Sequence, residues 1–211
     1  KSMDTTVAEK AGGVLKVYTH LNATKTQAKG ADFNALQSDK IVFNNQPIAL
    51  VVAESYEQAR YAANLVKATY NKEESLTDMM EGNKTESLKV PQRSPKPRGN
   101  PNETLSSSEV KFEAEYTIPI EHHNPMEMHG AIAFWEGDKL MMFDKSQGVY
   151  GVQGHLAQSF GISPKDVSVV SLFVGGAFGA ALKPNYYPFI TAMAAKDLKR
   201  PVKVNYTRRQ M

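Results

Sequence analysis

The chain has 211 residues, of which 25 are Lys or Arg and 22 are Asp or Glu, so its formal net charge is +3. These charges are spread along the sequence, whereas nucleic-acid-binding proteins usually carry a clustered basic face. The absence of cysteine excludes a disulfide framework, a thiolate metal site, an iron–sulfur cluster and a cysteine nucleophile in this sequence. No apolar run approaches the roughly 18 residues of a membrane span, and the first residues lack the apolar core of a signal peptide. We therefore expect a soluble protein that binds neither nucleic acid nor membrane.

Two structured blocks with a poorer segment between them are predicted along the chain. Residues 1–72 form the first block, and residues 110–211 form the second. Residues 73–109 carry four of the 11 prolines, a run of three serines and few large apolar side chains. Such a segment buries too little surface to offset its ordering entropy. We predict that it is an exposed linker.

The first block predicts a small α+β unit. Apolar runs at residues 14–18, 41–43 and 48–52 are typical of strands, and Asn44-Asn45 is a turn signal between the last two. A unit of roughly 65 residues is near the size at which a core of its own becomes marginal. We therefore expect this block to be a satellite of a larger body.

A short helix is predicted after these strands. Ser55 followed by Gln58 is a capping-box pattern, which marks a helix N-terminus. Residues 67–70 then return as a predicted strand. Small residues recur at helical spacing and predict a narrow face suited to close packing: Ala59, Ala62, Ala63 and Val66.

The second block begins with predicted strands. Residues 111–116 alternate apolar and polar side chains, as a half-buried strand does. Residues 131–135 and 140–143 flank Gly137-Asp138, and this pattern predicts a β-hairpin.

Two helices and two more strands complete the second block. Apolar residues spaced by four up to Phe160 predict a helix that stops at Gly161. Residues 167–174 predict a strand that opens into a glycine turn. A second helix is predicted through Ile190, and residues 202–206 predict the last strand.

The glycine turn is the first candidate for chemistry. Gly175, Gly176 and Gly179 stand between a predicted strand and a predicted helix. Glycine permits positive φ and close approach of a ligand, and free N–H groups at a helix start favour an anionic group. The spacing matches neither the Walker loop nor the dinucleotide fingerprint. A ligand cradle and a tight structural turn both remain open, and Phe178 between the glycines favours the cradle.

Three further polar features are candidates for a site. Gln147 follows the second hairpin strand and carries an amide that both donates and accepts hydrogen bonds. Residues 121–129 hold three histidines and two carboxylates, a composition that suits a divalent metal. Because Pro125 interrupts that run, a polar loop beside a pocket is the favoured interpretation. For Arg208 and Arg209 the alternatives are phosphate binding and a solvated strand end, and the strand end is favoured.

In chain order, these features resemble the molybdenum-binding large subunit of the xanthine dehydrogenase and aldehyde oxidase family. The resemblance covers nearly the whole chain. It implies an α+β fold, in which a small a/b hammerhead domain (1–72) and a linker (73–109) precede the first part of an α/β molybdopterin-binding domain (110–211). The matching motifs are residues 4–14, 46–53, 123–127, 146–148, 175–179, 200–204 and 207–208.

The resemblance implies cofactor-binding roles for six residues. Gln147 matches the glutamine that sits beside the molybdenum and hydrogen-bonds an oxygen there, and Phe178 lies in the loop that packs against the pterin. No catalytic or metal-ligating residue is assigned, because the family's glutamate general base is expected beyond Met211. The full cofactor-binding set is Gln147, Gly148, Gly176, Ala177, Phe178 and Gly179.

The resemblance also implies a reaction, a cofactor and partners. Such enzymes hydroxylate an aldehyde or N-heterocycle carbon with oxygen from water, using molybdenum–molybdopterin, for which a cytosine dinucleotide form is the expectation from bacterial relatives. The electrons leave through iron–sulfur and FAD subunits or domains, and the absence of cysteine agrees with clusters outside this chain. The purine-oxidising branch has a glutamate after the glycine loop where this sequence has Leu182. An aldehyde substrate is therefore favoured over xanthine.

We interpret the chain as part of a molybdenum hydroxylase large subunit, and we expect residues 1–211 alone to bind no cofactor and to be inactive. Two alternatives remain: a non-catalytic docking or maturation module with the same fold, and a small metal-binding protein that uses His122, His123 and His129. Uncovered apolar surface leads us to expect self-association. The cytoplasm is the favoured compartment, and the periplasm stays open through a partner subunit's export signal.

Overall fold

A computed structural model describes residues 2–28, 35–82, 96 and 98–211 of the chain. The chain divides into two units, one made of Lys1–Tyr70 with His122–Met211 and one made of Asn71–Glu121. Within the described residues, no helix is long and apolar enough to cross a membrane.

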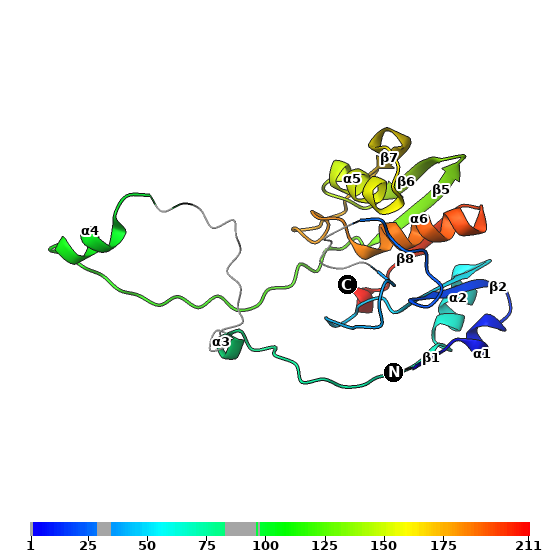
Figure 1. Cartoon of the computed structure of the whole chain (residues 1–211), viewed down its shortest axis with the longest axis horizontal. Coiled ribbons are helices and arrows are strands. Elements are labelled where there is room, and N and C mark those ends of the chain that lie inside the picture. The colour runs from blue at the N-terminus through cyan, green and yellow to red at the C-terminus, as the bar shows by residue number, and fades with distance from the viewer. Residues whose placement is uncertain (1, 29–34, 83–95, 97) are drawn as a thin grey trace. The chain divides into compact units, whose positions relative to one another are not determined.

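The first unit contains most of the regular structure (Figure 1). Its helices and strands are, in chain order, β1 (Ser2–Asp4), α1 (Thr6–Glu9), β2 (Val14–Thr19), β3 (Ala49–Ala53), α2 (Tyr56–Ala63), β4 (Lys67–Thr69), β5 (Gly130–Glu136), β6 (Lys139–Asp144), α5 (Val149–Phe160), β7 (Val167–Val170), α6 (Tyr186–Leu198) and β8 (Val202–Asn205). Short 3₁₀ turns lie at Pro164–Asp166 and Arg208–Gln210.

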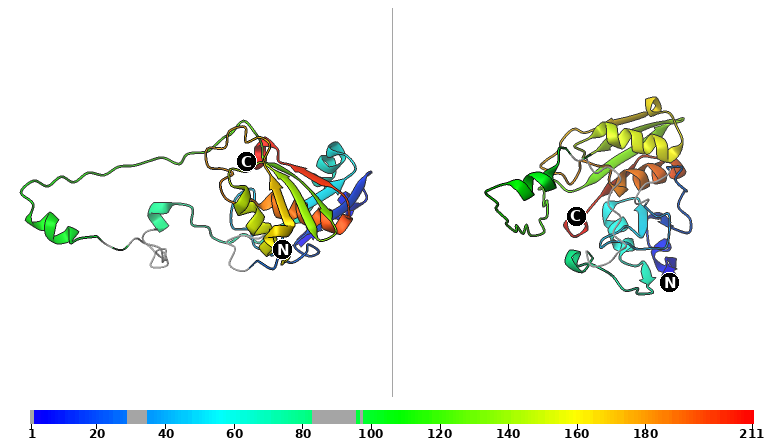
Figure 2. Two further views of the ribbon diagram at one scale, coloured as in Figure 1. Left: turned by 90° about the horizontal axis from the view of Figure 1, so that it is seen from above. Right: turned by 60° about the vertical axis from the view of Figure 1, so that its left-hand side comes forward.

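The largest sheet has the strand order β7-β6-β5-β8. The predicted hairpin is confirmed, because β5 pairs with β6 antiparallel, while β8 joins β5 antiparallel and β7 joins β6 in parallel. Figure 2 shows these four strands side by side in two further views. Helices α5 and α6 contact each other and pack on this sheet. Alternate residues of β5 and β6, such as Ala133 and Met142, are fully buried.

The first block forms two smaller ladders, β1 with β4 and β2 with β3. Helix α2 begins at the predicted capping box, in which Ser55 Oγ accepts from Gln58 N and the Gln58 side chain accepts from Ser55 N. The helix ends at Ala63, so Val66 of the predicted helical face lies beyond it.

Ion pairs and a hydrogen bond connect the first block to the second within the same unit. On β2, Lys16 Nζ lies 2.6 Å from Asp197 Oδ2 of α6, and the Tyr18 hydroxyl donates to the same oxygen at 2.7 Å. Arg200 donates to both carboxylate oxygens of Glu54, at 3.1 and 3.2 Å. The core is continuous as well, because Tyr18 and Val52 belong to the same apolar cluster as the residues of α6.

The predicted strand at residues 41–43 is wrong. The turn that follows it is present, with Asn45 at a left-handed φ of 64°. The Gln46 side chain accepts from Val42 N and donates to Lys40 O, each at 2.8 Å. These local side-chain bonds take backbone groups that a ladder would need, in the same way that short polar side chains compete with helices and sheets for backbone hydrogen bonds.

The predicted strand at residues 111–116 is also wrong. These residues have no regular structure, and their side chains are exposed. A strand needs a neighbour to pair with its backbone groups, and no described residue forms a ladder with this segment. The alternation in the sequence is real, but the structure supplies no partner for it.

The segment between β7 and α6 differs from its prediction at both ends. The strand predicted for residues 167–174 ends at Val170, and α6 begins only at Tyr186. The glycine turn therefore does not open directly into a helix. Its N–H groups belong to an irregular loop, residues 171–185, rather than to a helix N-terminus.

The second unit, Asn71–Glu121, contains the predicted linker and carries two short helices. Helix α3 spans Met79–Gly82, and α4 spans Pro101–Ser107. Helix α4 begins at the N-cap Asn100, whose side chain accepts from Glu103 N, and it buries no residue. The described part of the linker is exposed, as predicted, apart from the buried Gly82 and the half-buried Ser108.

Candidate functional site

Gln147 lies in the short connection between β6 and α5, at the end of the main sheet. Its backbone N–H donates to Ala181 O at 2.9 Å. Its side-chain Oε1 accepts from the N–H groups of Gly179 and Ala181, at 3.2 and 3.3 Å. Three hydrogen bonds therefore hold Gln147 against the glycine loop.

These bonds fix which way the Gln147 amide points. Backbone N–H groups need an acceptor, so the carbonyl oxygen must face the loop. The Nε2 group then faces away from Gly179 and Ala181, and no described residue hydrogen-bonds it. Gln147 is exposed. The arrangement offers two N–H donors beside the glycine loop.

The glycine loop has a backbone that ordinary residues rarely adopt. Gly175, Gly176 and Gly179 have φ values of 59°, 80° and 103°, and Phe178 has a φ of 52°. The Phe178 ring folds back toward Gly176, within 3.6 Å of where a Cβ there would lie. It remains 74% exposed. An apolar ring presented in this way is available to pack against a bound group.

The predicted polar loop lies along the glycine loop. Glu127 N donates to Gly175 O at 3.1 Å, and a Cβ on Gly175 would come within 2.4 Å of Glu127 Cβ. A Cβ on Gly179 would lie 3.2 Å from His123 Nε2. Glycine is favoured at both positions because their φ values are positive, and at Gly175 a side chain would also collide with Glu127.

Two cations hold the other side of this polar loop through its carbonyl groups. Arg208 donates to Pro125 O at 2.7 Å and to Met126 O at 2.8 Å. Lys145 Nζ donates to Glu127 O at 3.2 Å. Arg208 and Arg209 are both exposed, as the favoured interpretation of a solvated strand end expects, and Arg208 also makes these two backbone contacts. It fixes the backbone of the loop that contacts Gly175.

A cluster of buried polar and aromatic side chains lies at the end of β6, just before Gln147 in the chain. The rings of His129, Tyr187 and Tyr206 are in mutual contact, with centroids 5.3 to 6.2 Å apart. The Tyr187 hydroxyl donates to Lys145 O at 3.2 Å. Asp144, at the end of β6, is buried beside them. The cluster ties α6 and β8 to the strand end that carries Gln147.

Burial shifts the ionisation of this cluster. It raises the pKa of Asp144 to about 6, against opposing effects from the Tyr187 hydroxyl and from Lys145. It lowers the pKa of His129 to about 4, and the nearby Lys145 charge acts in the same direction. Burial therefore stabilises the neutral form of each side chain relative to its charged form, so that His129 is neutral at pH 7 and Asp144 takes up a proton near pH 6. His129 Nδ1, Asp144 Oδ1 and the Tyr206 hydroxyl are buried without a hydrogen-bond partner among the described residues.

The surface next to Gln147 is hollowed. A pocket of about 280 Å³ adjoins the glycine loop. Leu182, the residue predicted to disfavour a purine, is one of its lining residues and is 60% exposed. The pocket is lined by Gly179, Ala180, Leu182, Lys183, Pro184, Asn185 and Tyr186.

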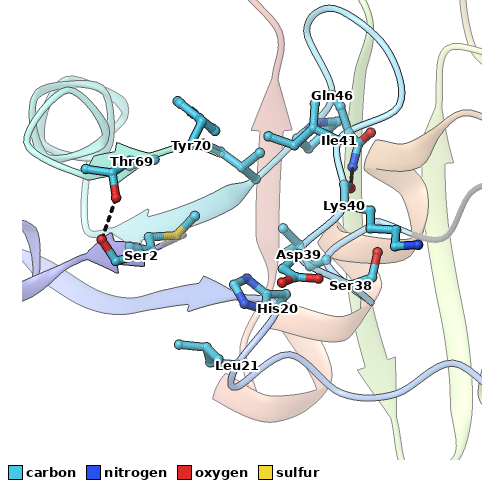
Figure 3. Close-up of a pocket in the computed structure, with 15 residues that line it drawn as sticks. Ser2, His20, Leu21, Ser38, Asp39, Lys40, Ile41, Gln46, Thr69 and Tyr70 are labelled. Atoms are coloured by element: carbon cyan, nitrogen blue, oxygen red, sulfur yellow. Dashed lines mark hydrogen bonds between the residues drawn. The ribbon is translucent and has the colours of Figure 1, made fainter. Parts of the chain in front are cut away.

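A second cavity, of about 150 Å³, lies in the first block and is drawn in Figure 3. Its lining includes Ser2 and Thr69, whose hydroxyls lie 2.6 Å apart, together with His20 and Asp39. None of the six predicted cofactor-binding residues lines it. This cavity is separate from the candidate site at Gln147.

The three histidines of the metal-binding alternative do not converge. His129 is buried against Tyr187, whereas His122 and His123 are exposed. Across the described part of the chain, no group of three His, Asp or Glu side chains is placed to hold a metal ion. The geometry does not support a metal site built from these histidines.

The structure brings together features that the sequence shows far apart. Gln147 and the predicted loop residues Gly176 to Gly179 form one site, and residues 123–127 and Arg208 support it. Gly148 caps the start of α5 beside them. The role of Tyr187 was missed, because a tyrosine in an apolar helix carries no sequence signal of the carbonyl it will contact.

Comparison with known families matches both blocks. Residues 80–211 match the family described as the molybdopterin cofactor-binding domain. Residues 1–74 match the a/b hammerhead domain of aldehyde oxidase and xanthine dehydrogenase.

Individual relatives agree with these matches. The aldehyde oxidoreductase molybdenum-binding subunit PaoC of Escherichia coli O157:H7 is 36% identical over 205 residues, which cover 96% of this chain and 28% of PaoC. A probable xanthine dehydrogenase subunit of Bacillus subtilis is 29% identical over 219 residues, which cover 99% of this chain and 29% of that protein. The chain thus spans less than a third of the length of these relatives.

Solved structures show the same fold. An aldehyde oxidoreductase from Desulfovibrio gigas matches with a TM-score of 0.77 at 24% identity, over 100% of this chain and 26% of that one. A CO dehydrogenase from Oligotropha carboxidovorans matches with a TM-score of 0.80 at 22% identity, over 100% of this chain and 30% of that one.

Proposed function

Because the chain belongs to the aldehyde oxidase and xanthine dehydrogenase family, we propose that it is part of the molybdenum-binding subunit of an oxidoreductase that acts on aldehydes. The overall reaction converts an aldehyde and water into a carboxylic acid, two protons and two electrons. PaoC, by its name, is an aldehyde oxidoreductase subunit. The similarity to PaoC supports this substrate class.

The observation that carries the proposal is the clamp on Gln147. Its Oε1 accepts from the N–H groups of Gly179 and Ala181, so the side chain cannot rotate without breaking two hydrogen bonds. The amide donors are thereby preorganised before any ligand arrives. Preorganised donors are effective because they need no reorganisation when charge develops at the oxygen they contact.

The residues present suit a molybdenum–molybdopterin cofactor. Gln147 supplies donors to an oxygen of the group, and Phe178 supplies an exposed apolar ring. Gly148, Gly176, Ala177 and Gly179 let the backbone come close to a ligand without obstructing side chains. When bound, the cofactor supplies the two-electron redox chemistry. The chain's own contribution is to bind and orient.

The lining of the pocket beside Gly179 supports an aldehyde over a purine. Leu182 offers an apolar surface with no hydrogen-bonding group. The ring nitrogens of a purine need hydrogen-bond partners in the site, and a site without such partners does not select for a purine. A small aldehyde with an apolar substituent makes no such demand.

The remaining parts of the proposal concern the whole enzyme. We propose a cytosine dinucleotide form of the pterin, and iron–sulfur and FAD partner subunits that carry electrons away, since this chain has no cysteine. We propose that the enzyme works in the cytoplasm.

The test uses two variants of the full-length subunit in its complex. Gln147→Ala removes both the clamp and the donors, and Gln147→Glu keeps an acceptor for the two N–H groups but removes the donors. We expect both variants to lose aldehyde turnover on the order of 100-fold and to keep a folded subunit, measured by circular dichroism. Molybdenum content should be assayed in parallel.

Gln158→Ala is the matched control, because Gln158 is exposed on α5 and no described residue hydrogen-bonds it. It should retain full turnover. Unchanged turnover in Gln147→Ala would contradict the proposed site, and full turnover in Gln147→Glu would contradict the donor role.

A further inference from the structure

Residues 110–120 carry a complete strand pattern with no strand. Val110, Phe112, Tyr116, Ile118 and Ile120 occur at every second position, apart from Ala114, and each of these five is more than 80% exposed. In an extended chain, side chains two residues apart share one face. The segment therefore presents one continuous apolar face.

The backbone N–H and C=O groups of residues 110–120 also make no ladder hydrogen bonds with described residues. Figure 1 shows the segment as an extended trace. A row of exposed N–H and C=O groups is the usual template for strand addition. Among the described residues, the apolar side chains of this segment therefore have no packing partner and its main chain has no ladder partner.

Proline 119 defines which edge of the segment is able to pair. In a strand, the N–H and C=O of one residue point to one edge, and those of the next residue point to the other. The edge with Lys111 and Glu113 also contains Pro119, which has no N–H. The edge with Phe112, Ala114, Tyr116, Ile118 and Ile120 has every donor.

The polar face argues against pairing between two copies in most registers. Glu113, Glu115 and Glu121 outweigh Lys111 on that face. Antiparallel self-pairing centred on Glu115 would place its carboxylate opposite its own copy, and parallel in-register pairing would stack every glutamate on itself. The antiparallel register centred on Tyr116, with Lys111 opposite Glu121, avoids such pairs. Like charges directly opposite one another destabilise a strand pair.

Chain length points to a different occupant. The curated relatives that match this chain are more than three times as long as the region matched, because that region is 28–29% of each. A subunit of that length contains further secondary structure, and its sheets have edges for a strand to join. That edge must offer an apolar face toward Phe112 and Tyr116, and a neutral or basic face toward the glutamates.

We propose that residues 110–120 are a docking strand, which adds through the edge carrying Phe112 to Ile120 to a β-sheet in the part of the subunit outside residues 1–211. This inference shares one assumption with the proposed function, which is that the subunit is as long as its relatives. Pro119 leaves the strand as the outermost one of that sheet. The apolar side chains of the docked strand then extend the apolar face of the sheet that it joins.

Residue-resolved amide hydrogen exchange tests the docking strand directly. In the 211-residue chain we expect residues 110–120 to exchange at the rate of an unstructured peptide. In the full-length subunit we expect roughly 100-fold protection at the amides of Phe112, Ala114, Tyr116, Ile118 and Ile120. The amides of Lys111, Glu113, Glu115 and Thr117 should stay unprotected.

Two variants of the full-length subunit sharpen the test. Ile118→Asp puts a charge on the apolar face and should abolish the protection, whereas Thr117→Asp puts the same charge on the polar face and should preserve it. Equal protection on both edges would overturn the edge assignment. Absence of protection in the full-length subunit would overturn the docking strand itself.

Protection already present in the 211-residue chain would also overturn the proposal. If it rose with protein concentration, the occupant would be a second copy, and if it did not, the occupant would be the chain's own first unit. The readout needs no activity, so the two proposals fail separately. Protection in a subunit that does not oxidise aldehydes rejects the function alone, and aldehyde oxidation without protection rejects the docking strand alone.

Discussion

Strand β5 has apolar side chains at five consecutive positions, residues 131–135, and residues 110–120 alternate apolar and polar side chains, yet only β5 forms a strand. β5 pairs with β6 on one edge and with β8 on the other, and α6 packs on it. Residues 110–120 have no paired neighbour among the described residues. The comparison teaches that alternation determines which side chains share a face, while a strand forms only where another segment supplies its hydrogen bonds.

The largest effect is expected from placing the same charge in both segments. Ala133 of β5 is fully buried between Met142 and Val202. Ala114 is the alanine on the apolar face of residues 110–120, which we call the open segment, and it is exposed. Ala133→Asp buries an unpaired carboxylate and should lower the free energy of unfolding by about 4 kcal/mol. Ala114→Asp should change it by less than about 0.5 kcal/mol.

Urea unfolding of the 211-residue chain measures both variants. Trp135, the single tryptophan, lies on β5 and donates to Ala192 O at 2.9 Å, so its fluorescence reports on the packed sheet. A cost for Ala114→Asp as large as that for Ala133→Asp would show that residues 110–120 are packed already and would break the comparison.

Titratable side chains packed against the main sheet should respond to pH differently from those of residues 110–120. Burial raises the pKa of Asp144 from its ordinary 3.8 to about 6, so the native state takes up a proton before the unfolded chain does, and stability rises as pH falls from 6 to 4. Burial lowers the pKa of His129 from 6.5 to about 4, so its contribution to stability is lost as pH falls from 6.5 to 4. Each contribution is worth about 3 kcal/mol, and the two oppose one another.

Removing either titrating group should reveal the pH-dependent stability contribution of the other. Between pH 7 and pH 4, Asp144→Asn should lose about 3 kcal/mol of stability relative to the wild type, because only the His129 contribution remains. His129→Gln should gain a similar amount over the same range. Glu115→Gln in the open segment is the control and should follow the wild type. Parallel pH profiles for all four proteins, from urea unfolding, would contradict the buried environment assigned to Asp144 and His129.

Local sequence signals predicted the local structure well. The capping box at Ser55 and the hairpin across Gly137 are present, because each depends on residues only a few positions apart. The strand predicted at residues 41–43 failed for a local reason, since Gln46 takes the backbone groups of Val42 and Lys40. A glutamine four residues away carries no pattern that announces such bonds.

Local sequence patterns did not predict which residues come together in the candidate site. Gln147, the glycine loop and Arg208 were each recognised as polar features, but their contacts join residues separated by 32 to 83 positions. Spacing along a sequence gives no distance in space for such pairs. The resemblance to a family implies a cofactor-binding role for Gln147, which stays a prediction, and the structure adds the hydrogen bonds from Gly179 and Ala181 that orient its amide.

The smallest difference should appear between the two helix caps. Ser55 caps α2, whose Ala62 is fully buried in the first unit, and Asn100 caps α4, which buries no residue. Each side chain satisfies a backbone N–H of its own helix. Ser55→Ala should therefore lower the free energy of unfolding by about 1 kcal/mol, because α2 is lost only when the packed unit unfolds. Asn100→Ala should leave it unchanged.

The contrast holds because a cap contributes to global stability only if its helix unfolds with the core. Melting of the 211-residue chain, followed by Trp135 fluorescence, should show a lower midpoint for Ser55→Ala alone. Ser55→Asp is the conservative variant, since aspartate also accepts at an N-cap, and it should restore most of the loss. A lowered midpoint for Asn100→Ala would mean that α4 unfolds together with the sheet, and that residues 71–121 are coupled to the packed unit.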